Sequence, residues 1–90
     1  MDDRKLIEFR DLVDEIIYAP TKADAKPLIS RLKFAASGLK NDLDPYIFSK
    51  LNEVIAYADQ ASGRVKNKEH WISCVDQSWY VFENGFNKNT

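Results

Sequence analysis

The chain has few of the residues that most often carry covalent or metal chemistry. Its 90 residues include one cysteine, Cys74, and one histidine, His70. A single cysteine excludes an intramolecular disulfide, which is typical of a reducing compartment. Cys74 and His70 are four residues apart and would supply only half of a zinc site. We therefore expect no metal, no cofactor and no catalytic residue, and we interpret Cys74 as a small hydrophobic residue that packs against the core.

The chain also lacks long apolar runs and an excess of either charge. No segment reaches the roughly 18–20 apolar residues of a membrane-spanning helix, and no apolar signal-peptide region follows the first residues. Basic and acidic residues number 13 and 14, for a net charge of -1. No overall field therefore draws the protein to nucleic acid or to a membrane. We expect a cytoplasmic protein with neither of these as a partner.

Glycine and proline are scarce, with three of each, and no segment alternates apolar and polar residues as a strand does. Hydrophobic residues make up 44% of the chain, which is enough for a folded domain with one modest core. We expect an all-α domain over residues 1–86 and a disordered polar tail over residues 87–90.

The first two predicted helices are bounded by proline and capping signals. The first runs from about Asp3 to Tyr18 and ends before Pro20. The second begins near Asp24, which places Pro27 in the first turn, where a missing N–H group costs little. The alternative start is Thr21, with Asp24 as the other half of a capping box. Gly38 is expected to end this helix.

The third predicted helix begins at Asp44-Pro45 and ends at Ser62-Gly63. The fourth follows Asn67 and is expected to stop at Gly85. Apolar residues over 71–86 recur at spacings of three and four and cover about half of the helix circumference. We therefore expect the fourth helix to occupy a central groove between the other three. Short connections predict a compact up-and-down bundle of four helices, or alternatively three helices plus a short fourth.

An acidic stripe on the first helix breaks the usual charge preference. Ile7, Asp11, Asp14 and Tyr18 lie on one stripe beside the core face. The acidic residues lie toward the carboxyl end of the helix, where negative charge is unfavourable, and Asp11 repels Glu15 four residues later. Such a local cost often marks a functional site. The stripe predicts a partner-binding surface, and the alternative is a solvated face neutralised by lysines of a neighbouring helix.

Three aromatic residues predict further partner contacts. Phe34 points away from the apolar face of the second helix, and Tyr46 and Tyr57 lie along one stripe of the third. Exposed aromatic residues among charges are typical of binding hot spots. Alternatively, Phe34 packs under a loop and the tyrosines surround the core with their hydroxyl groups in water.

A basic loop leads into the fourth helix. Arg64, Lys66 and Lys68 lie beside the backbone N–H groups of that helix start, an arrangement that can hold a phosphate. No second basic patch extends this loop into the footprint that a nucleic-acid duplex needs. The alternative is a solvated loop.

Taken together, these patterns predict a small non-enzymatic protein that acts by binding another protein, whose basic site the acidic stripe would capture. Inhibitors, immunity proteins, antitoxins and small regulators commonly have this size, which is an analogy at the level of fold alone. One alternative is a homodimer formed through the wide aromatic face of the fourth helix. Another is a nucleic-acid-associated regulator that uses residues 64–68.

Overall fold

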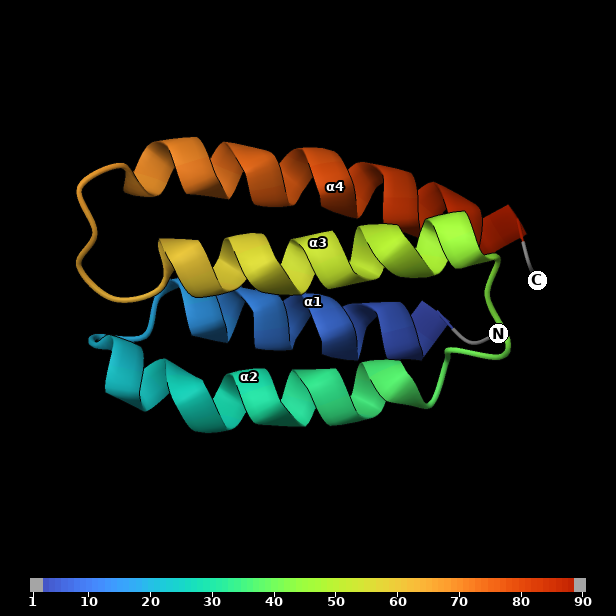
Figure 1. The fold of residues 1–90 in the computed structure, drawn as a ribbon, viewed down its shortest axis with the longest axis horizontal. Coiled ribbons are helices and arrows are strands. Elements are labelled where there is room, and N and C mark those ends of the chain that lie inside the picture. The colour runs from blue at the N-terminus through green and yellow to red at the C-terminus, as the bar shows by residue number, and fades with distance from the viewer. Residues whose placement is uncertain (1–2, 89–90) are drawn as a thin grey trace.

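The computed structural model describes residues 3–88, which form four α-helices and no strand (Figure 1). The helices are α1 (Asp3–Ile17), α2 (Lys22–Ser37), α3 (Pro45–Ala61) and α4 (Lys68–Lys88). Consecutive helices run antiparallel, because each short connection turns the chain back along the previous helix. The predicted up-and-down bundle of four helices is thus confirmed.

The helix α3 packs against each of the other three helices, and α1 packs against α2 and α3. In Figure 1, α1 and α3 occupy the middle of the bundle and run in the same direction, with α2 and α4 on either side. The prediction that the fourth helix is central is therefore wrong. The backbone of α4 lies close mainly to α3. Its wide apolar face reaches the core through bulky side chains such as Trp79, Phe82 and Phe86.

One contiguous core joins all four helices. Its members follow the spacings of three and four that the sequence displays, because these spacings place side chains on one helix face. The largest side chains with almost no exposed surface are Phe82, Phe86, Ile16, Ile17, Leu32 and Leu51. The two phenylalanines lie on α4, so the aromatic face of this helix is buried inside the bundle.

The start of α2 differs from the preferred prediction. The Oγ1 atom of Thr21 accepts a hydrogen bond from the backbone N–H of Asp24 at 3.1 Å, so the alternative start at Thr21 is correct. Pro27 consequently lies inside the helix and cannot donate to the carbonyl group of Ala23. The backbone N–H of Ala25, a fully buried residue, donates to the carbonyl group of Thr21 at 3.2 Å and closes the first turn from this earlier start.

The other predicted starts and ends show one clear difference. The carboxylate of Asp44 accepts the N–H of Tyr46 at 2.8 Å and thereby caps α3, as predicted. Gly85, in contrast, does not end α4. A Cβ atom at Gly85 would lie 2.3 Å from Cδ1 of Ile47, so this glycine allows α4 to approach α3 closely.

Because α4 continues past Gly85, residues 87 and 88 are helical and do not belong to the predicted polar tail. Residues 89–90 of that tail lie outside the described part of the chain, as do residues 1–2 of the predicted domain. Over residues 3–88, no helix combines the length and the apolar character needed to cross a membrane.

Candidate functional site

A groove of about 650 Å³ lies between α1 and α2 on the outside of the bundle. We call it the α1/α2 groove. Its most prominent residue is Phe34, whose exposed fraction of 84% is the largest of any bulky apolar side chain in residues 3–88. The α1 wall and the α2 wall contribute four lining residues each: Glu8, Asp11, Leu12 and Glu15 from α1, and Ser30, Arg31, Phe34 and Ala35 from α2.

The carboxylates of the α1/α2 groove are held together by helix geometry. Glu8, Asp11 and Glu15 are spaced by three and four residues, so α1 presents them on one flank next to its core face. None of them forms an ion pair with another described residue. Arg31 is the one basic residue among the lining residues, so the groove carries three negative charges and one positive charge, a formal charge of -2.

The predicted stripe on α1 is divided by the structure. Ile7 and Tyr18 are 60% and 67% exposed, and Asp11 is exposed and lines the α1/α2 groove. Asp14 does not line the groove; it is half-buried and accepts a hydrogen bond from Arg10 at 3.2 Å. Three of the four stripe residues are therefore exposed, and Asp14 belongs to a separate polar cluster.

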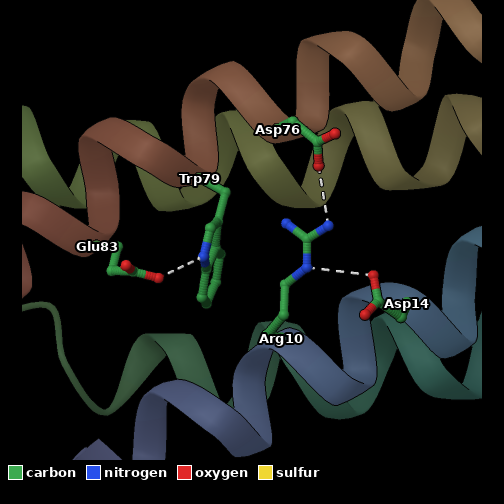
Figure 2. Close-up of polar contacts among 5 residues, drawn as sticks. All are labelled: Arg10, Asp14, Asp76, Trp79 and Glu83. Carbon is green, nitrogen blue, oxygen red and sulfur yellow. Dashed lines mark hydrogen bonds and ion pairs between the residues drawn. The ribbon is translucent and has the colours of Figure 1, made fainter.

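This polar cluster joins α1 to α4 (Figure 2). Arg10 donates to Asp14 and, at 2.9 Å, to Asp76 of α4, and its guanidinium carbon lies 5.5 Å from the centroid of the Trp79 ring. The indole N–H of Trp79 donates to Glu83 at 2.8 Å. These side chains fill the space between α1 and α4, so we assign them a structural role.

The remaining predicted aromatic residues lie outside the α1/α2 groove. Tyr46 is 59% exposed, and the ammonium of Lys50 lies 5.4 Å from its ring centroid. Tyr57 is half-buried against the core, where its ring stacks on Trp71 with centroids 6.0 Å apart. Tyr57 thus follows the alternative interpretation, in which a tyrosine borders the core.

Lys68 of the basic loop has a structural role that the sequence did not indicate. Its ammonium group donates to the carbonyl oxygens of Ile17, Ala61 and Gly63, the last two at 2.8 and 2.9 Å. Ile17 and Ala61 are the last residues of α1 and α3, whose parallel course brings their carboxyl ends together. Neither helix has a basic residue in its own last turn, so Lys68 supplies the favourable positive charge.

Lys68 is therefore not available to the predicted phosphate site, because its three N–H donors are bonded to three carbonyl groups. Burial lowers the pKa of Lys68, and the nearby ammonium of Lys22 lowers it further. Arg64 and Lys66 remain exposed and line a shallow pocket together with Tyr18. For these two residues, phosphate binding stays a prediction.

The Cys–His pair lies in contact, with Sγ of Cys74 3.8 Å from Nε2 of His70. Cys74 is half-buried, and residues 3–88 contain no group of three or more histidine, cysteine, aspartate or glutamate side chains placed to hold a metal ion. The surface predicted for a homodimer is not accessible to a second copy, because Val75, Phe82 and Phe86 of the aromatic face of α4 are fully buried within the bundle.

The sequence pattern missed Glu8, Leu12 and Arg31 as groove residues. The spacing of Glu8, Asp11 and Glu15 was visible in the sequence, but the wall that faces them comes from another helix. Searches with protein-family models, curated proteins and solved structures find no significant match to this chain. The candidate site therefore depends on the geometry of the α1/α2 groove.

Proposed function

We propose that this protein acts without catalysing a reaction, by binding another protein through the α1/α2 groove. The observation that carries this proposal is the 84% exposure of Phe34 at the edge of a groove of about 650 Å³. Single exposed apolar residues are common on protein surfaces. Here, however, the exposed ring stands beside a concave surface that also contains Leu12 and Ala35, which is an arrangement typical of a binding hot spot.

The charges of the α1/α2 groove support the same proposal. Asp11 and Glu15 are four residues apart on α1, a spacing at which like charges destabilise a helix by about 0.2–0.5 kcal/mol. Glu15 also lies in the last turn of α1, close to the negative end of the helix dipole. A partner with positive charges would relieve both unfavourable interactions. The mechanism would be occlusion of a basic site on the partner, in a reducing compartment such as the cytoplasm.

The test is a comparison of captured proteins for three tagged chains: wild type, Phe34→Asp and Tyr80→Asp. Tyr80 is the matched control because it is a 70% exposed aromatic residue on α4 that does not line the α1/α2 groove. We expect wild type and Tyr80→Asp to capture the same protein in stoichiometric amount from nuclease-treated lysate of the source cell. Phe34→Asp should lose this protein, as quantified by mass spectrometry.

A stability measurement keeps this test interpretable. Because the Phe34 side chain is almost fully exposed, Phe34→Asp should change the free energy of unfolding by less than about 1 kcal/mol. The proposed function is contradicted if the three chains capture identical sets of proteins. It is also contradicted if Phe34→Asp unfolds the domain, since Phe34 would then belong to the core.

A further inference from the structure

We propose that the partner segment that occupies the α1/α2 groove is a basic amphipathic helix. This inference rests on the proposed function and adds the chemistry and the secondary structure of the partner. It follows from three properties of the groove: the sign of its charge, the spacing of its carboxylates, and the helices that form its walls.

The sign and spacing of the charges come from α1. Glu8, Asp11 and Glu15 extend along two turns of the helix, a length of about 10 Å. They form no ion pair with a described residue, so their charges are available to a partner. A helix laid along the α1/α2 groove repeats its side chains at the same rise per turn. Lysines or arginines spaced by three and four residues on such a helix would therefore face successive carboxylates.

The apolar surface of the α1/α2 groove favours an amphipathic partner over a uniformly charged one. Leu12 is half-buried between the two walls, and Phe34 and Ala35 border it from α2. An apolar side chain of the partner would cover Leu12 and the ring of Phe34. Arg31 lies on the α2 wall, so the partner flank that faces α2 should be neutral. The groove thus selects a helix whose two flanks differ in charge.

The secondary structure of the partner follows from the binding surfaces that a helical bundle contains. Residues 3–88 contain no strand, so the described chain has no sheet edge to which an extended peptide could add. Two antiparallel helices with a groove between them can instead receive a third helix, whose side chains pack between the ridges of both. A formal charge of -2 opposes a phosphate-rich ligand in the same groove.

The probe is a synthetic peptide of leucine and lysine, roughly four turns long, with its lysines spaced by three and four residues on one flank. It is titrated into the isotope-labelled full chain while backbone amide shifts are recorded by nuclear magnetic resonance. We expect saturable shift changes concentrated at residues that line the α1/α2 groove. A peptide with glutamate in place of lysine should not bind, and added salt should weaken binding of the lysine peptide.

A charge variant and a matched control test whether the carboxylates of the α1/α2 groove bind the lysine peptide. Removing one exposed ion pair weakens binding by about 1.5-fold to fivefold, so Asp11→Asn combined with Glu15→Gln should raise the dissociation constant about fivefold. Asp42→Asn combined with Glu69→Gln removes the same charge at exposed positions outside the groove and should change it less than about twofold. The groove variant should be at least as resistant to thermal unfolding as wild type, because the repulsion between Asp11 and Glu15 is gone.

The inference is overturned if the two double variants bind the lysine peptide equally well, or if the shift changes lie outside the α1/α2 groove. It is also overturned if the free protein shows concentration-dependent shifts in this groove, since a second copy of the chain would then be the occupant. A cellular partner that Phe34→Asp loses, but whose cross-linked segment is not basic, would overturn this inference and leave the proposed function intact.

Discussion

Replacing Lys68 by methionine removes the ammonium group that connects the ends of α1 and α3. In the folded protein this group donates to carbonyl oxygens of Ile17, Ala61 and Gly63. Methionine has a similar length and can pack in the same space, but it has no hydrogen-bond donor. The substitution therefore isolates the three hydrogen bonds and the positive charge from the packing of the side chain.

The expected loss of stability follows from the type of bond. A hydrogen bond to a charged group contributes about 1.5–3 kcal/mol, and a cation at a helix carboxyl end contributes about 0.3–1 kcal/mol. These contributions are not additive, and water can reach part of the exposed side of Lys68. Burial of the ammonium group and its repulsion by Lys22, which lower its pKa, offset part of this stabilisation. We therefore expect Lys68→Met to lower the free energy of unfolding by about 1.5 kcal/mol, which corresponds to a decrease of about 9 °C in Tm for a domain of this size.

The pH dependence gives a second signature of the same group. Burial and the nearby Lys22 lower the pKa of Lys68 from its usual value of 10.5. Between the lowered pKa and 10.5, the unfolded chain binds the proton more tightly than the folded chain, so the contribution of Lys68 to stability rises with pH. The variant has no amine at this position. The difference in unfolding free energy between wild type and Lys68→Met should therefore widen as the pH rises through this range.

Urea denaturation followed by far-ultraviolet circular dichroism measures both effects. Lys66→Met is the matched control, because Lys66 is an exposed lysine of the same loop and its loss should change the free energy by less than about 0.5 kcal/mol. A shift of the urea midpoint at constant slope would show that stability alone has changed. If Lys68→Met and Lys66→Met have the same midpoint, water replaces the ammonium group and our assignment of Lys68 is wrong.

Two further predictions concern glycine and proline. Gly85→Ala should destabilise the protein by about 2 kcal/mol in urea denaturation, because the new Cβ atom would overlap Ile47. Adding Ile47→Ala to the same chain should relieve this clash. Gly38→Ala is the control, because a Cβ atom there would meet no atom closer than 3.4 Å, and it should raise the free energy of unfolding by about 0.5 kcal/mol. Equal effects of the two alanine substitutions would refute the packing argument. Pro27→Ala should stabilise the protein by about 1 kcal/mol and raise its thermal midpoint, because the restored N–H can donate to the carbonyl group of Ala23 within α2. A lower midpoint would show that proline suits this position.

Part of the candidate site was predictable from the sequence. Exposure of Phe34 follows from its position opposite the apolar face of its own helix, and the structure agrees. The unfavourable placement of Asp11 was visible for the same reason, because both depend on residues within one or two turns. The groove itself was not predictable in this way, because Leu12 and Arg31 become neighbours only when α1 and α2 pack side by side.

The same distinction applies to the charged residues with structural roles. The prediction placed Asp14 in a partner surface, but Asp14 pairs with Arg10 four residues earlier, and Arg10 in turn donates to Asp76, 66 residues away in the chain. The prediction placed Lys68 in a phosphate site, but the carbonyl group of Ile17 that it binds is 51 residues away. No periodicity or spacing within one helix indicates that Asp76 and Ile17 are the distant partners.

The sequence by itself determined the number and type of the secondary-structure elements, the side of each helix that faces the core, and the Asp44-Pro45 start of α3. These features depend on hydrophobic spacing and on hydrogen bonds between residues close in the chain. The tertiary structure decided the central place of α3 and the need for glycine at position 85. Both depend on which helices become neighbours, because the residues of one helix do not specify the side chains that another helix places against them.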